Sequence, residues 1–253
     1  MEFDYYNWLL VFLRLSAFLF VLPFFSATNF PVAMRIALGA LMALLLTPTL
    51  PPVSINHLSL YPLIGLAAQE ISIGLLLGFV SRMVFFAADL AGNVISTELG
   101  LNMGAIFNPL TQQSSQATST ILFFLAAIVM LTLDLHHWIL VGFQRTYLVL
   151  PIGGAHLNSA LFETVVGHTS KIFVVALQIA APIMAVSFVV TVVFAVLSRA
   201  VPQMNVFILS FPFRIAGGLA VFGFTLQLTG QHVMNYLHKL PDDLMNVAQL
   251  LGG

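Results

Sequence analysis

The chain has 253 residues, of which 60% are hydrophobic and only 7% are charged, and its formal net charge is −1. Soluble domains carry about 25% charged residues, so this composition excludes a water-soluble globule and predicts an all-α protein of the integral membrane type. The near-zero net charge excludes the basic surface that nucleic-acid binding requires. Because the sequence contains no cysteine, disulfides, thiolate metal ligands and cysteine nucleophiles are excluded as well.

Apolar segments follow one another along the chain and predict about six long helices, because no strand-like alternation persists in any of them. They are residues 8–25, 32–50, 60–88, 121–141, 172–197 and 206–228. The segment 172–197 has no charged side chain and exceeds the roughly 20 apolar residues that match the hydrocarbon core of a bilayer. Since Glu2 and Asp4 make the start acidic, we expect an uncleaved first helix rather than a signal peptide. The spread of Lys and Arg leaves the orientation open.

The segment 92–120 is polar and, apart from Glu98, uncharged, with a turn signal at Asn108-Pro109. Connections longer than about 12–15 residues without regular structure are usually functional or disordered. Interleaved Ile106, Phe107 and Leu110 argue against simple disorder. An ordinary polar loop between two spans remains an equally good interpretation of this segment.

The C-terminal residues 231–253 differ from the apolar segments before them. Leu240-Pro241-Asp242-Asp243 predicts the end of one helix and the acidic start of another. The apolar residues that follow repeat at helical spacing: Leu244, Val247, Ala248 and Leu251. We therefore expect a short amphipathic helix that lies on a partner.

Charged residues recur inside the apolar segments, namely Arg14, Arg35, Glu70, Arg82, Asp134 and Arg214. Each costs about 2.5–3.5 kcal/mol at a bilayer centre on insertion scales. For Arg35, Arg82 and Arg214 the alternative interpretation is that the side chain snorkels toward water near a helix end, and we prefer it for about half of them. Glu70, Arg82 and Asp134 are predicted buried polar residues. Gly74 and Gly78 form a small-xxx-small face for helix packing, and the two features together favour a subunit within an assembly.

Asp134-Leu135-His136-His137-Trp138 is the sequence cluster that most resembles a metal or acid–base site. We expect the adjacent histidines to point to different sides of a helix and to chelate poorly together. The chain has no His-Glu-x-x-His spacing and no phosphate-binding glycine loop. We therefore predict an interfacial, non-catalytic role for this cluster, and no enzyme, metal or cofactor.

The stretch between the last two apolar segments is dense in polar residues. Pro202 cannot continue the preceding helix, Gln203 and Asn205 can serve unpaired backbone groups, and Arg199 favours a helix C-terminus. A plain hairpin turn explains each residue singly, but it does not require the whole string.

Two strings carry a family resemblance: Arg-Ala-Val-Pro-Gln-Met-Asn-Val-Phe at 199–207 and Phe-Pro-Phe-Arg-Ile at 211–215. They resemble the FliR family of flagellar export-apparatus proteins, whose injectisome relatives are the SctT-type proteins. Arg14, the Pro23–Pro31 connection, Arg35 and the long segment 98–113 fit as well, so the resemblance covers nearly the whole chain. It marks six residues as subunit-interface positions: Arg199, Pro202, Gln203, Asn205, Phe207 and Arg214.

The resemblance implies a subunit of the type III export gate in the flagellar basal body of the bacterial inner membrane. Unfolded flagellar proteins pass through this gate, with energy from an ATPase and the proton gradient. The partners implied are FliP-like and FliQ-like subunits and FlhB-like and FlhA-like components, in contact with membrane lipid. Residues 1–171 would be FliP-like, 172–230 a FliQ-like hairpin and 231–253 a C-terminal tail.

The resemblance also implies a pore plug near residues 104–116. Its members are Gly104, Ile106, Phe107, Asn108, Pro109, Leu110, Thr111, Gln112 and Gln113. Amides and hydroxyls hydrogen-bond without fixed charge, and the apolar members can seal against an apolar ring.

Two other classes of function remain open. A small-solute secondary transporter would use Glu70, Arg82 and Asp134 as a midplane site, although the sequence shows no inverted repeat. A membrane enzyme would be built on Asp134 and His136.

Overall fold

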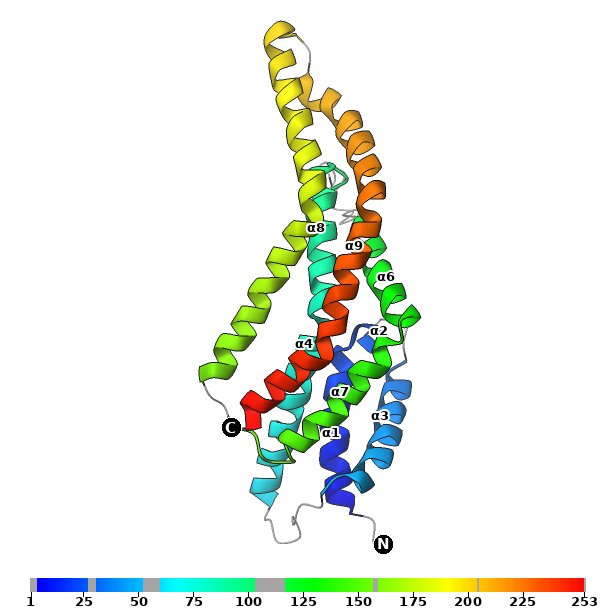
Figure 1. The fold of residues 1–253 in the computed structure, drawn as a ribbon, viewed down its shortest axis with the longest axis vertical. Coiled ribbons are helices and arrows are strands. Elements are labelled where there is room, and N and C mark those ends of the chain that lie inside the picture. Colours follow the sequence, from blue (N-terminus) through cyan, green and yellow to red (C-terminus); the bar gives the residue numbers. More distant parts are fainter. Residues whose placement is uncertain are drawn as a thin grey trace. The chain divides into compact units, whose positions relative to one another are not determined.

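The computed structural model describes residues 4–26, 31–51, 60–102, 117–156, 159–203 and 205–252. Throughout these ranges the regular structure is helical, without strands, which confirms the all-α prediction (Figure 1). The helices are α1 (Tyr5–Val21), α2 (Pro23–Ser26), α3 (Val32–Leu46), α4 (Leu60–Glu98), α6 (Ala117–Thr132), α7 (Leu135–Val149), α8 (Ser159–Ala200) and α9 (Val206–Gly252), with a 3₁₀ turn η1 at Thr47–Thr49.

Several helices have the length and apolar composition needed to cross a membrane. Four such stretches occur in the described ranges, at Val32–Thr49, Tyr61–Glu98, Ser159–Ala200 and Ile208–Gly252. Helices α6 and α7 together form a further candidate that is bent by 75°. The predicted segment 121–141 is broken at this bend, because Asp134 adopts a φ of 53° in the left-handed region and interrupts the helical hydrogen bonds.

The chain divides into two compact units. The first comprises Met1–Met83, Leu133–Thr169 and Leu237–Gly253, and the second comprises Val84–Thr132 and Ser170–Tyr236. Each unit therefore combines part of residues 1–171 with part of residues 172–253.

Helix α1 is the amphipathic helix at the start of the first unit. Asp4 caps it, because its carboxylate accepts hydrogen bonds from the backbone N–H groups of Tyr6 and Asn7 at 3.2 Å. The buried residues repeat at intervals of three and four and form one face: Asn7, Leu10, Val11, Arg14, Leu15, Phe18 and Leu19. The ring of Phe18 stacks on that of Phe143 from α7, with centroids 4.4 Å apart. This face therefore joins α1 to α7.

Gly74 and Gly78 hold α4 close to α1. A Cβ atom added to Gly74 would collide with the carbonyl oxygen of Arg14 and with Ala17. One added to Gly78 would lie 2.8 Å from the Cβ of Val21. The small-xxx-small face thus accommodates a helix of the same chain, because only glycine leaves room for this backbone approach.

The predicted helix end at Leu240–Asp243 is wrong, since α9 continues through Pro241 to Gly252. A proline removes one N–H group, and burial of Leu240 and Leu244 on either side of it favours continued helix. The remaining apolar face of the tail is also buried: Val247, Ala248 and Leu251. Gly142 of α7 lies close to Pro241 and Leu244, so the C-terminal residues pack on α7 of the same chain.

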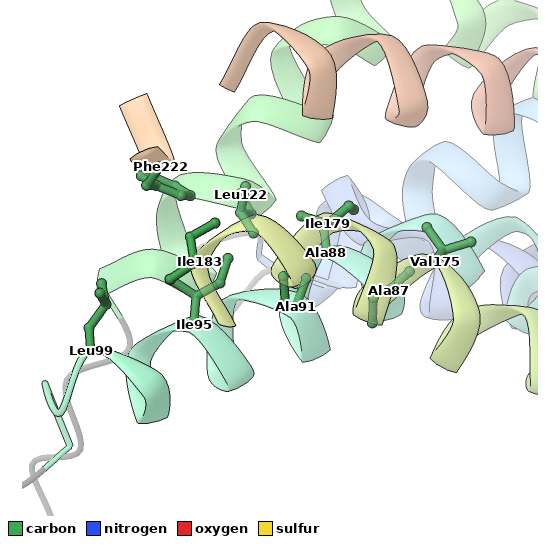
Figure 2. Close-up of a cluster of buried hydrophobic side chains, with 12 residues drawn as sticks. Ala87, Ala88, Ala91, Ile95, Leu99, Leu122, Val175, Ile179, Ile183 and Phe222 are labelled. Atoms are coloured by element: carbon green, nitrogen blue, oxygen red, sulfur yellow. The ribbon is translucent and has the colours of Figure 1, made fainter. Parts of the chain in front are cut away.

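The second unit has its own apolar core, which Figure 2 shows. Residues from α4 and its C-terminal end, α6, α8 and α9 contribute: Ala87, Ala88, Ala91, Ile95, Leu99, Leu122, Val175, Ala176, Ile179, Ala180, Ile183 and Phe222. The alanines on α4 and α8 are small enough to let helices approach closely.

Several helices leave large apolar side chains uncovered. Within an 18-residue apolar window of each helix, 61% of the residues are buried in α4, whereas 11% are buried in α3, 22% in α8 and 17% in α9. Phe162, Phe188, Phe213 and Phe224 are all more than half exposed. Exposed apolar surface of this extent indicates contact with lipid or with other proteins.

Candidate functional site

Arg14 of α1 and Glu70 of α4 form a fully buried, two-pronged ion pair. Arg14 Nε lies 2.5 Å from Glu70 Oε2, and Arg14 Nη2 lies 3.0 Å from Glu70 Oε1. Both side chains have no exposed surface. Two parallel N–H···O bonds between a guanidinium and a carboxylate are the strongest common geometry for such a pair.

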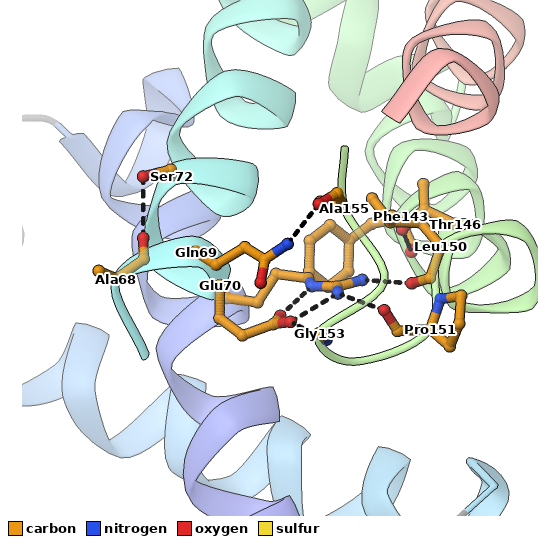
Figure 3. Close-up of polar contacts among 11 residues, drawn as sticks. Ala68, Gln69, Glu70, Ser72, Phe143, Thr146, Leu150, Pro151, Gly153 and Ala155 are labelled. Carbon is orange, nitrogen blue, oxygen red and sulfur yellow. Dashed lines mark hydrogen bonds and ion pairs between the residues drawn. The ribbon is translucent and has the colours of Figure 1, made fainter. Parts of the chain in front are cut away.

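The remaining polar atoms of the pair are satisfied by the turn that follows α7. Arg14 donates to the carbonyl oxygens of Leu150 at 3.0 Å and Pro151 at 3.5 Å. Glu70 accepts a hydrogen bond from the backbone N–H of Gly153 at 3.0 Å, and Gly153 adopts a φ of 76° that favours glycine. Figure 3 shows these contacts, with Glu70 on one side and the carbonyl groups of Leu150 and Pro151 on the other.

The guanidinium of Arg14 also lies over the ring of Tyr147, with its carbon 4.2 Å from the ring centroid. The ion pair and its partners, here called the Arg14–Glu70 node, therefore join α1, α4, α7 and the turn after α7. The sequence analysis singled out Glu70 but not Tyr147 or the carbonyl oxygens of Leu150 and Pro151. The carbonyl oxygens could not be predicted, because every residue type carries the same backbone acceptor.

The other two predicted buried polar residues are placed differently. Arg82 is half-buried and donates to the carbonyl oxygen of Val21 at 3.4 Å, at the C-terminal end of α1. A cation is favoured there by the helix dipole. The prediction that Asp134 is buried is wrong, because its side chain is 74% exposed. The break between α6 and α7 turns this residue outward instead of leaving it within one continuous helix.

The expectation that His136 and His137 point to different sides of a helix is also wrong. Their ring centroids lie 4.1 Å apart. Both residues belong to the first turn of α7, directly after the left-handed residue Asp134, and their rings are close neighbours there.

The 199–207 string forms the turn between α8 and α9 in the second unit. Arg199 lies in the last turn of α8, and Pro202, Gln203 and Asn205 are exposed. Asn205 Oδ1 accepts a hydrogen bond from the backbone N–H of Ile208 at 3.4 Å and thereby caps α9. The side chain of Phe207 lies outside the described part of the structure.

Arg214 of α9 connects the two helices that this turn joins. Its Nη2 donates to the hydroxyl of Thr191 on α8 at 2.9 Å. A side chain that hydrogen-bonds to the neighbouring helix removes part of the cost of placing a cation in an apolar segment. The α8–α9 turn therefore exposes Pro202, Gln203 and Asn205, while Arg214 makes one hydrogen bond between the two helices.

The predicted plug residues 104–113 lie outside the described residues, but both flanks of the segment are described. Helix α4 ends in a Schellman motif, in which Leu101 N–H donates to the carbonyl of Ser96 at 2.9 Å and Gly100 N–H to that of Thr97 at 3.0 Å. Gly100 has the left-handed φ of 75° that this ending requires. The predicted irregular segment is therefore too long, since residues 92–98 and 117–120 are helical.

Hydroxyl groups of α6 fasten the other flank to α4. Thr118 Oγ1 donates to the carbonyl of Gly92 at 2.7 Å and hydrogen-bonds to the hydroxyl of Ser96. Ser119 Oγ donates to the carbonyl of Asp89 at 3.1 Å. A Cβ atom on Gly92 would collide with the backbone of Ser119. These contacts, here called the α4–α6 stem, join the two helices that flank residues 103–116.

A groove of about 450 Å³ lies in the first unit between α4 and the residues around Ala155 and Leu251. It is mostly apolar, with Gln69, Ser72 and His156 as its polar lining, and Gln69 Nε2 donates to the carbonyl of Ala155 at 2.7 Å. The midplane residues of the transporter hypothesis, Glu70, Arg82 and Asp134, do not line this groove.

Membrane-length helices, a fully buried ion pair and exposed apolar helix surfaces define an all-α protein of the membrane type. The chain belongs to family 1 of the bacterial export proteins, whose family model matches residues 5–240.

Relatives of the chain carry the name flagellar biosynthetic protein FliR. The one from Escherichia coli K12 is 27% identical over 242 residues, which cover 94% of this chain and 92% of the relative. The relative from Bacillus subtilis is 28% identical over 248 residues, which cover 96% and 95%. That from Buchnera aphidicola of Acyrthosiphon pisum is 29% identical over 235 residues, which cover 92% and 88%. The resemblance to the FliR family is thus confirmed.

Proposed function

We propose that the chain is a subunit of the flagellar type III export gate and forms part of the channel through which unfolded flagellar proteins leave the cell. The observation that carries this proposal is the end-to-end similarity to flagellar biosynthetic proteins, which extends over 94% of the chain for the Escherichia coli relative. We assign no catalytic residue to this function.

The exposed apolar surface supports an assembled rather than a solitary protein. Helices α8 and α9 are long, and less than a quarter of the residues in an 18-residue apolar window of each helix are buried within the chain. Unlike subunits of the FliP and FliQ types would cover part of this surface in the bacterial inner membrane, and lipid would cover the rest. FlhB-like and FlhA-like components would dock on the same assembly.

Within this assembly, residues 1–171 correspond to the FliP-like part and 172–230 to the FliQ-like hairpin. The α8–α9 hairpin, whose helices are joined by the hydrogen bond between Arg214 and Thr191, supports the hairpin in this proposal, and its helices extend beyond residues 172–230 on both sides. Arg199, Pro202 and Gln203 at its tip are exposed in the single chain. In the proposed assembly they contact a neighbouring subunit, which supplies partners for the polar groups of the turn.

Residues 104–113 close the channel in the resting state. Support comes from the α4–α6 stem, whose hydrogen bonds from Thr118 and Ser119 join the two helices that flank the segment. A loop with fixed ends loses less conformational entropy when it seats in a pore than a loop with free ends.

The observed contacts do not favour a solute transporter. Glu70 pairs with Arg14, Arg82 contacts Val21, and Asp134 contacts His137. Each of the three proposed midplane residues thus contacts a different neighbour, and Asp134 is largely exposed.

Genetic complementation tests the proposed function. The gene for this chain is expressed in a bacterium that lacks its own FliR-type protein, and swimming and flagellin secretion are measured. Restored secretion that requires the intact 199–207 string is the expected result. In a second experiment, the gene is deleted from the chain's own host and then re-expressed there. Normal membrane insertion of the re-expressed chain without any secretion would contradict the proposal.

A further inference from the structure

Asp134, His136 and His137 form a compact cluster of potential metal ligands at the break between α6 and α7. Each residue offers one ligand atom, and these atoms all lie within 4.8 Å of one another. Asp134 Oδ1 is 3.6 Å from His137 Nδ1. The cluster lies apart from the Arg14–Glu70 node in its contacts and is unused by the proposed function.

The carboxylate of Asp134 is not engaged in the role that its position suggests. Asp134 is the N-cap residue of α7, where an aspartate normally accepts hydrogen bonds from the next backbone N–H groups. Its side chain makes no such capping bond. The left-handed backbone, with a φ of 53°, instead directs the carboxylate toward His137.

The separation between these groups fits a shared ion better than a direct bond. A distance of 3.6 Å between Asp134 Oδ1 and His137 Nδ1 exceeds the range of a good hydrogen bond. Ligand atoms about 2.0–2.2 Å from a tetrahedral zinc ion lie about 3.4 Å from one another. The side chains of Asp134 and His137 are 74% and 68% exposed. Small rotations of these two side chains can therefore bring their ligand atoms to the same spacing from the ligand atom of His136.

His136 supplies a free ring nitrogen. Its Nδ1 is covered and has no hydrogen-bond partner among the described residues. Most buried polar atoms are hydrogen-bonded, and a neutral imidazole nitrogen without a donor can give its lone pair to a metal ion.

We propose that Asp134, His136 and His137 bind a first-row transition-metal dication of the zinc class. Two imidazoles and one carboxylate suit zinc, copper and nickel, whereas magnesium and calcium require mainly oxygen ligands. The bound ion would tie the N-cap residue Asp134 to the first turn of α7, with water in the remaining position. It would face the positive end of the α7 dipole, and the negative charge of Asp134 offsets this repulsion.

Metal titration of the full-length chain in mild detergent tests this inference. Zinc is titrated against a chromogenic chelator, and cobalt is added in parallel because its visible absorption reports on coordination. We expect one zinc ion per chain, and we expect His137→Ala and Asp134→Asn each to weaken binding by about tenfold or more, in line with the effects of disturbing metal sites. His238→Ala is the matched control, because His238 is an exposed histidine outside the cluster, and it should leave the affinity unchanged.

Thermal unfolding gives a second measurement on the same samples. A ligand that binds the folded state raises its melting temperature, so zinc should stabilise the unmodified chain and the His238→Ala variant but not His136→Asn. Zinc binding of equal strength in the His137→Ala, Asp134→Asn and unmodified chains would overturn the inference. So would the absence of zinc binding to a folded, unmodified chain.

Discussion

Gly74 lies directly against the carbonyl oxygen of Arg14, one helical turn after Glu70 binds the guanidinium of the same arginine. The close approach of the two backbones and the buried ion pair therefore occur at one crossing of α1 and α4. Only a residue without a Cβ atom leaves space for this crossing, and only a carboxylate at position 70 neutralises the charge that the crossing buries.

Removal of one partner of the ion pair should destabilise the protein strongly. Glu70→Leu leaves the Arg14 guanidinium buried without its counter-charge, which costs about 3–5 kcal/mol in comparable pairs. Unfolding of the purified chain in detergent would measure the loss. Arg145→Leu is the control, since Arg145 is exposed on α7. A loss for Glu70→Leu no larger than that for Arg145→Leu would show that the pair is not a structural requirement.

Simultaneous replacement of both partners should be less harmful than single replacement. The variant Arg14→Met with Glu70→Leu removes both charges and avoids an uncompensated ion. Recovery should be incomplete, because the carbonyl of Leu150 and the N–H of Gly153 lose their partners. A double-mutant cycle in the same unfolding assay measures this coupling, and strictly additive effects would refute it.

Enlargement of Gly74 should weaken the α1–α4 crossing. Gly74→Ala places a Cβ atom against the backbone of Arg14, and overpacking of this kind costs about 1–3 kcal/mol. Gly65→Ala, in the same helix, has no atom within 4 Å of the added Cβ and should be neutral or stabilising because alanine favours helix over glycine. Equal unfolding midpoints for the two variants would argue against close packing at Gly74.

The α4–α6 stem should restrain the segment that follows α4. Thr118→Val keeps the side-chain shape but removes the hydroxyl that bonds to Gly92 and Ser96, and leaving such buried partners unsatisfied costs about 1–3 kcal/mol. Limited proteolysis should then cut within residues 103–116 faster than in the unmodified chain. Thr132→Val, at the exposed end of α6, should not change the rate. Identical cleavage of both variants would mean that the stem does not control this segment.

Shortening of the proposed plug should open the closed channel to ions. Deletion of residues 108–113 removes Leu110 and the amide and hydroxyl groups of the plug, while Ile106, Phe107 and the stem residues remain. Conductance of the reconstituted gate should rise, and assembly should be unchanged. Replacement of the same residues by a Gly/Ser linker of equal length should leak as well, because it lacks the sealing side chains. An undiminished ion barrier in both variants would contradict the plug.

The sequence predicted the helical class and the family, but it predicted individual contacts unevenly. The burial of Glu70 followed from a lone carboxylate deep in an apolar segment. The partner carbonyls at residues 150 and 151 could not be predicted, since they depend on the path of the backbone. The break at Asp134 was missed because hydrophobic composition continues across it from 121 to 141.

At the C-terminal tail, a local sequence signal predicted a helix end that the structure does not have. Leu240-Pro241-Asp242-Asp243 has the local chemistry of a helix end, yet α9 passes through it. Packing of Leu244 and Val247, both fully buried, outweighs the loss of one backbone hydrogen bond at Pro241. Local signals predict where a helix can stop, whereas tertiary burial decides whether it does.

The most direct test of the central claim is the identification of what the chain purifies with from its own membranes. The tagged chain is extracted in mild detergent, and the complex is analysed by native mass spectrometry. The proposed export-gate function predicts a defined complex that contains unlike subunits of the FliP and FliQ types, and it predicts that substitution of the exposed Arg199 and Gln203 reduces their recovery. A stable, homogeneous monomer or homo-oligomer that transports small solutes alone would contradict it.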